Sequence, residues 1–192
     1  MGRSMPAPAF PIANVNLDGL SPSDAIDRFL KARKDDRWVL LGDHAPQSFD
    51  QLWTAWIQAT RNELRGSMVA RSVDAEFLRY LAGTHHISEA FARAGVQDGQ
   101  ASAWVACLPA AVGEANDLGH LQPRSEGNGR FEVDLQSLLA SLGWALIESE
   151  VCSSIEGCET LGIDLNGWSE NRRFESVVAH VLMADDQSSS HR

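Results

Sequence analysis

The sequence predicts a mixed α/β fold: a single domain with a central, partly antiparallel sheet flanked by helices. Short apolar segments of strand character occur between segments whose apolar residues recur every three or four positions. These segments do not follow the regular strand–helix–strand order of a parallel sheet. The 192 residues, 44% of them hydrophobic, suffice for one domain with its own core. No apolar run approaches the roughly 20 residues of a membrane-spanning helix, so we expect a cytoplasmic protein with no membrane partner.

Polar or proline-rich segments delimit this domain. We expect residues 1–11 to be a flexible leader without a targeting signal, residues 12–184 to be the folded domain and residues 185–192 to be a disordered tail. Residues 113–130 are rich in Gly, Asn, Glu and Pro, which is typical of a surface loop or insertion.

The first 65 residues contain two predicted strands and two predicted helices. Residues 12–17 alternate apolar and polar side chains, as a strand does. The Ser-Pro pair at 21–22 marks a helix start, and that helix should end near Lys34. The apolar run 37–41 predicts a buried strand. Ser48 then begins the longest helix, which has one broad apolar face.

A helix pair is expected next. Residues 65–70 indicate a turn and a short strand, and Ser72 is placed to cap the helix that follows. Gly83 ends that helix, and a second short helix runs from Ile87 to Gly95.

The last half contains a strand at 101–108, a helix at 133–142, a strand at 144–151 and a terminal helix at 170–183. Residues 152–169 match no element.

The chain shows no motif of a known chemistry. It lacks the glycine-rich loops that bind nucleotide phosphates. Cys107, Cys152 and Cys158 have neither zinc-site nor redox spacing, so we expect reduced thiols, no metal and no cofactor.

Two groups of polar residues still allow chemistry. Glu148 and Glu150 share one face of a predicted strand, where a catalytic carboxylate pair is conceivable and a solvated face is favoured. His85 and His86 are adjacent, which is not metal-ligand spacing; a surface turn is the first interpretation, a phosphate or ribose contact the second and a metal site the third. The lack of a coherent acid, base and nucleophile set favours a binding protein over an enzyme. A small hydrolase or transferase using Glu148, Glu150 or His85 stays the alternative.

Charge is unevenly distributed. The formal net charge is −10, which opposes non-specific binding to nucleic acids. Residues 97–192 carry five Arg against fifteen acidic residues, whereas residues 61–96 carry five Arg against four acidic residues. A local basic surface in the middle of the chain could therefore still contact a nucleic acid. Solubility is the simpler explanation of the acidic half.

One continuous segment is distinctive. Residues 70–91 read Ala-Arg-Ser-Val-Asp-Ala-Glu-Phe-Leu-Arg-Tyr-Leu-Ala-Gly-Thr-His-His-Ile-Ser-Glu-Ala-Phe. This segment resembles the signature of the kinase-binding regulatory subunit family of the KEOPS complex. That signature has an acidic helix of FLxYLxG character, a polar turn, and Ile and Ala at the start of a second helix. The match extends over residues 67–96, and the elements before and after it fit the expected order.

The resemblance implies a protein without catalytic activity or a small-molecule substrate. Members of this family bind the small atypical kinase/ATPase subunit of KEOPS. They also recruit tRNA by holding its single-stranded 3′ CCA end, and a different subunit installs threonylcarbamoyladenosine. A purely protein-binding subunit without RNA contact is the other alternative.

The segment offers the contacts that a single RNA strand needs, namely cations for phosphates and exposed groups for bases. Arg71 and Arg79 could bind phosphates, the turn could offer backbone N–H groups and imidazoles, and Ile87 could contact a base. Both arginines could instead pair with Asp74 and Glu76, and Ile87 is at least as well explained as a core residue. The candidate tRNA-binding residues are Arg71, Arg79, Gly83, Thr84, His85, His86 and Ile87.

Overall fold

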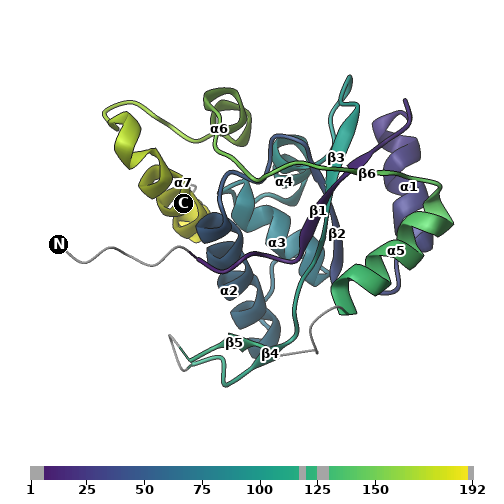
Figure 1. Cartoon of the computed structure of the whole chain (residues 1–192). Coiled ribbons are helices and arrows are strands. Elements are labelled where there is room, and N and C mark those ends of the chain that lie inside the picture. The colour runs from purple at the N-terminus through teal and green to yellow at the C-terminus, as the bar shows by residue number, and fades with distance from the viewer. Residues whose placement is uncertain (1–6, 117–119, 125–129, 190–192) are drawn as a thin grey trace.

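A four-stranded sheet separates two layers of helices (Figure 1). The computed structural model describes residues 7–116, 120–124 and 130–189. The strand order is β2-β3-β1-β6, and each of the three pairings is antiparallel. The mixed α/β class is therefore confirmed, and the sheet is antiparallel at every described pairing. Its strands are β1 (Ile12–Asn16), β2 (Trp38–Gly42), β3 (Ser102–Cys107) and β6 (Leu146–Ile147).

Alternation along the strands creates two hydrophobic cores. Val39 and Leu41 of β2, with Trp104 of β3, lie in the larger core, whereas Leu40 and Val105 lie in the smaller one. Successive side chains of a strand point to opposite faces, so both faces of the sheet must be covered.

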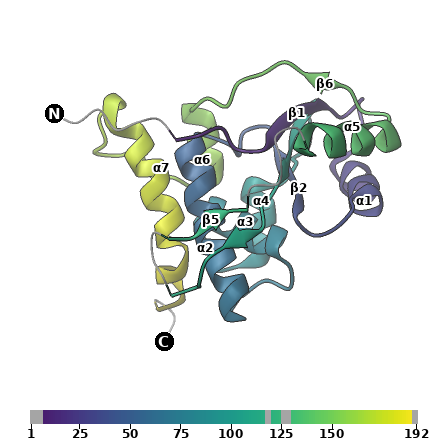
Figure 2. The same ribbon diagram turned by 60° about the horizontal axis from the view of Figure 1, so that its bottom comes forward.

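The two faces carry different helices (Figures 1 and 2). The smaller core is covered by α1 (Pro22–Ala32) and α5 (Arg130–Leu142). The larger core is covered by α2 (Phe49–Arg65), α3 (Val73–Leu81), α4 (Ile87–Ala94), α6 (Ile155–Leu161) and α7 (Arg173–Leu182).

Serine caps start three of these helices. The hydroxyls of Ser21, Ser48 and Ser154 accept backbone N–H groups of the first turns of α1, α2 and α6. The first two caps were predicted. The third lies in the segment 152–169, which sequence patterns left unassigned.

Several segments differ from the sequence-based expectation. Residues 65–70 form a turn and bends and contain no strand. The strand expected at 144–151 is only the short β6. Within the region 113–130, β5 (Gln122–Pro123) pairs with β4 (Ala111–Val112), which lies just before that region. The predicted loop is therefore partly structured at its edges, while residues 117–119 and 125–129 lie outside the described residues.

Both ends of the described chain pack on the domain. Phe10 is 4% exposed and contacts the rings of Trp53 and Phe77. The structure here differs from the flexible leader expected for residues 1–11, of which residues 1–6 lie outside the described part. At the other end, α7 follows the 3₁₀ helix η1 (Glu170–Arg172) and continues into the 3₁₀ helix η2 (Met183–Ser189), where a disordered tail was expected from residue 185.

Among the described residues, no helix combines the length and the apolar character that crossing a membrane requires.

Candidate functional site

The helix pair α3–α4 contains all but one of the predicted site residues, Arg71 lying just before it. Gly83 follows Ala82, the C-cap of α3, and adopts φ 57°, a left-handed conformation that glycine accepts without a Cβ clash. The Thr84 hydroxyl then donates to Glu89 Oε2 (2.5 Å) and accepts the backbone N–H of His86 (3.2 Å). These bonds lock a short turn between the two helices.

Arg79 does not face solvent. Its side chain is 0% exposed, and its guanidinium forms ion pairs with Glu76 (2.8 Å) and Asp185 (2.9 Å). It also donates to the carbonyls of Thr84 (3.4 Å) and Ala184 (3.5 Å). The prediction of Arg79 as a phosphate ligand is corrected on this geometry, because its donors are directed to protein groups and no water or ligand can reach it.

The charges in this cluster are stabilised by one another. Burial alone would raise the pKa of Glu76, but hydrogen bonds from Arg79, Ala70 and Asn62 lower it below its usual range. Burial would lower the pKa of Arg79, but the hydrogen bond and charge of Glu76 outweigh this and raise it. Burial, and the hydrogen bond that the Tyr80 hydroxyl donates to Asp185 (2.8 Å), raise the pKa of Tyr80 to about 12. Glu76 and Arg79 therefore stay charged, and Tyr80 stays neutral, at physiological pH.

The Glu76 carboxylate also explains why residues 65–70 are not a strand. Its Oε2 accepts the backbone N–H groups of Val69 (3.1 Å) and Ala70 (2.9 Å). Those donors are thus satisfied without a neighbouring strand.

The predicted turn is partly covered by α7. The His180 ring lies against Gly83, so closely that a Cβ at position 83 would collide with it. Gly83 and Thr84 are both buried. Their role is therefore to shape the turn, and their burial corrects the prediction that they contact RNA.

Four predicted site residues keep solvent access. His86 and Arg71 are exposed, while His85 and Ile87 are half-buried. Arg71 makes no side-chain ion pair or hydrogen bond with the described residues and lies at the opposite end of α3 from the turn, about 14 Å away by helix rise.

Phe91 is not among the predicted site residues, and its side chain is 47% exposed. It lies one turn after Ile87 and on the same side of α4. The exposed His86 and Phe91, with the half-buried Ile87, therefore form a surface strip, which we call the α4 strip.

The other candidate groups lie outside the α3–α4 pair. Glu148 and Glu150 are exposed, and Glu150 lines a cleft at one end of the sheet together with Asp43, Asp98 and Glu156. No described group of three or more His, Cys, Asp or Glu could hold a metal ion. None of the three cysteines is in a disulfide with another described residue, and burial raises the pKa of Cys158.

Comparison with protein families assigns the chain to a family. The sequence model of the family described as kinase-binding protein CGI-121 matches residues 25–149. The chain belongs to this family. The match runs from α1 to the end of β6 and includes the α3–α4 pair, so the resemblance to the KEOPS regulatory subunit family is confirmed at the level of the family. No individual curated protein matches the chain.

Loss of the Arg79 guanidinium should destabilise this CGI-121 family protein severely. Arg79→Met leaves the buried Glu76 carboxylate without its cation, which costs about 3–5 kcal/mol of unfolding free energy. Urea unfolding followed by circular dichroism measures this cost. Arg71→Met, the same change at an exposed position, should stay within about 0.5 kcal/mol of the wild type. Equal stability of the two variants would contradict the structural role of Arg79.

Stability should also fall on acidification because of His180. Burial, with a further contribution from Arg93, lowers the pKa of His180 below its usual 6.5. Below pH 6.5 the unfolded chain takes up a proton that the folded chain resists, so unfolding becomes easier by up to about 1.4 kcal/mol per pH unit. Urea midpoints between pH 8 and pH 5.5 should therefore drop more steeply for the wild type than for His180→Gln. Parallel pH profiles would show that this ring does not carry the effect.

Proposed function

We propose that this chain is the non-catalytic, kinase-binding subunit of a cytoplasmic KEOPS-type assembly that makes threonylcarbamoyladenosine in tRNA, and that it recruits tRNA through the single-stranded 3′ CCA end. Membership of the kinase-binding CGI-121 family supports the kinase partner. The observation that supports the RNA part is the α4 strip: an exposed histidine, a half-buried isoleucine and an exposed phenylalanine beside a locked turn.

The α4 strip suits unpaired bases. Every base has a π-face, and stacking on an exposed aromatic ring contributes about 1–3 kcal/mol per base without requiring a particular sequence. Phe91 provides such a ring, and Ile87 extends the apolar surface by one helical turn. The locked turn holds His86 at the start of α4, so little conformational entropy is lost on binding.

Phosphate contacts on this face are few. Arg71 is exposed, whereas Arg79 is buried and Arg93 is engaged by Glu89 and by the Ala82 carbonyl. A strand that reaches both Arg71 and the α4 strip must run along the length of α3. We therefore expect the affinity for RNA to depend only weakly on salt concentration and mainly on base stacking.

A separate surface suits the kinase. Phe174, Val178 and Leu182 recur every four residues along α7, and Phe174 and Leu182 are 53% and 51% exposed. Such an apolar stripe on a helix is a common docking surface for a protein partner. The stripe lies beyond the residues that the family model matches, and we propose it as this chain's kinase contact.

Phe91→Ala should weaken tRNA binding by roughly one stacked base, about 1–3 kcal/mol. Gel shifts compare intact tRNA with tRNA lacking its CCA end. The wild type should prefer the intact tRNA, and Phe91→Ala should lose this preference. Phe174→Ala removes an equally exposed ring elsewhere and should keep it. Arg71→Ala should reduce the slope of log affinity against log salt by about one. Binding that ignores the CCA end would instead support a subunit that contacts only protein.

Charges placed in the α7 stripe should release the kinase. We expect the double variant Phe174→Glu and Leu182→Glu not to co-purify with the small kinase, because two carboxylates would be desolvated in an apolar interface. The matched control, Val133→Glu with Leu146→Glu, adds the same charge at exposed apolar positions on α5, across the sheet from α7, and on the edge strand β6. Retention of the kinase by the stripe variant would rule out this surface, and loss in both variants would point to charge alone.

A further inference from the structure

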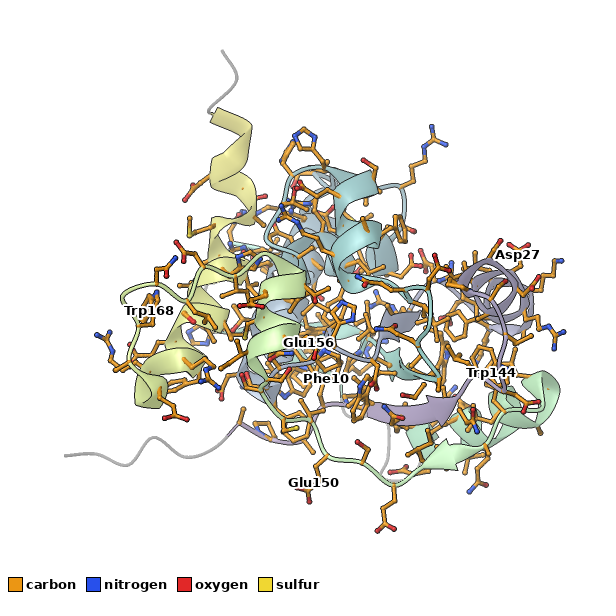
Figure 3. All side chains as sticks on the ribbon, turned by 90° about the horizontal axis from the view of Figure 1, so that it is seen from above. Phe10, Asp27, Trp144, Glu150, Glu156 and Trp168 are labelled. Carbon is orange, nitrogen blue, oxygen red and sulfur yellow. The ribbon has the colours of Figure 1, made fainter. Side chains whose placement is uncertain are left out.

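The two ends of the sheet differ in charge. One end, where β2 begins and β3 ends, borders a cavity of about 350 Å³ that is bounded also by α5 and the β4–β5 hairpin. The opposite end opens into a wider cleft of about 650 Å³ with no Lys or Arg among its described lining residues. Figure 3, a view along another direction, places Glu150 and Glu156 of this cleft away from α5. Its carboxylates are Asp43, Asp98, Glu150 and Glu156.

The smaller cavity is cationic. Lys34, Arg37, Arg124 and Arg130 line it, against the carboxylates of Asp35 and Asp134. These are four of the 16 Lys and Arg residues in a chain with a net charge of −10, so their convergence is a local inversion of the overall charge.

The four cations are not equally available. Arg37 is held by both oxygens of Glu63 (2.6 and 2.8 Å) and by the Pro109 carbonyl (3.3 Å). In contrast, the side chains of Lys34 and Arg124 are exposed and form no ion pair or hydrogen bond with another described residue. These two donors can therefore bind an anion without breaking a contact to any of the residues that the structure describes.

The floor of the cavity is apolar. Trp38 and Phe131 stack with their ring centroids 5.8 Å apart and their planes at 18°. Trp38 is buried, Phe131 is half-buried, and both line the cavity. Leu108, Pro109 and Ala110 complete this surface. An apolar floor with a few charged groups at the rim is the usual composition of a small-molecule site, and ligand pockets span roughly 300–1,000 Å³.

We propose that this cavity, which we call the β2–α5 cavity, binds one nucleoside phosphate, with its flat base on the apolar floor beside Phe131 and its phosphate at Lys34 and Arg124. A volume at the lower end of the usual range accommodates a single nucleotide and excludes a folded partner. Charge-assisted hydrogen bonds from a lysine and an arginine select phosphate over a neutral group. The nucleotide can be free in solution or an unpaired residue of an RNA. This site is remote in sequence from the α4 strip and does not depend on the function proposed above.

Isothermal titration of the full chain with AMP, adenosine and ribose 5-phosphate tests both halves of the site. AMP should bind at least about tenfold more tightly than either fragment, since adenosine lacks the charged group and ribose 5-phosphate lacks the base. Equal affinity for AMP and adenosine would overturn the phosphate contact. Equal affinity for AMP and ribose 5-phosphate would overturn the apolar floor as a base site.

A charge-reversal pair locates the site. Lys34→Glu with Arg124→Glu should lower the affinity for AMP at least about tenfold. The control, Arg28→Glu with Lys31→Glu, makes the same change in net charge at exposed positions of α1 that do not line the cavity. Equal AMP affinity in the two double variants, both folded by circular dichroism, would sink the proposal.

Competition identifies the source of the nucleotide. If a short single-stranded RNA displaces AMP from the wild type and loses affinity in the Lys34 and Arg124 variant, the β2–α5 cavity holds an RNA nucleotide. If AMP binds and RNA does not displace it, the ligand is a free nucleotide. Phe91→Ala should leave AMP binding unchanged, so failure of the α4 strip and failure of this cavity are distinguishable.

Discussion

The buried Arg79 guanidinium is the constraint on which the rest of this face of the molecule depends. A charged group without access to water is tolerated only when its charge is balanced and its donors are used. Arg79 balances its charge and uses both terminal nitrogens with partners from three places: Glu76 on its own helix, the Thr84 carbonyl in the turn, and Ala184 with Asp185 beyond α7. Its Nε–H is buried without a hydrogen-bond partner among the described residues. No single segment could satisfy this group. Its burial therefore requires the C-terminal segment to be folded against the α3–α4 pair.

This requirement links the two surfaces that we propose for binding. The inner side of α7 places His180 on Gly83 and so supports the turn, whereas its outer side presents the apolar stripe. The α4 strip begins two residues after the buried Thr84. A change in how α7 packs would thus alter the turn from which the strip starts. Linkage of this kind is reciprocal, because a partner that stabilises one arrangement of α7 favours the matching arrangement of the turn.

Charge is also arranged by the topology. In an antiparallel sheet the start of one strand lies beside the end of its neighbour, so residues near 35 and 108 meet at one end, and residues near 43 and 101 meet at the other. The first end gathers cations around the β2–α5 cavity, and the second gathers carboxylates. An acidic protein thereby keeps one concave surface that attracts anions, while the opposite end repels them.

Local signals in the sequence determined most of the secondary structure. Ser21 and Ser48 are caps because a hydroxyl placed before a helix can accept a free N–H of the first turn, although Ser72, also predicted as a cap, forms no such bond. The apolar run at 37–41 predicted a buried strand, and β2 has both faces buried. The signature at residues 70–91 also placed the chain in its family. These features depend on neighbours within a few positions, which the sequence displays directly.

Burial of single polar and aromatic residues was decided only in three dimensions. From its neighbours in the sequence, Arg79 looks like an exposed cation, but the structure buries it. Phe91 follows Ile87 at helical spacing, as a core residue would, but its side chain is 47% exposed. Arg79 is buried because Asp185, more than a hundred residues later, folds back to meet it, and Phe91 is exposed because none of the described helices covers that side of α4. The sequence by itself determined which helices and strands form and to which family they belong. Only the tertiary structure decided which of their side chains remain available to a partner, because solvent access depends on long-range contacts that helical or strand periodicity does not encode.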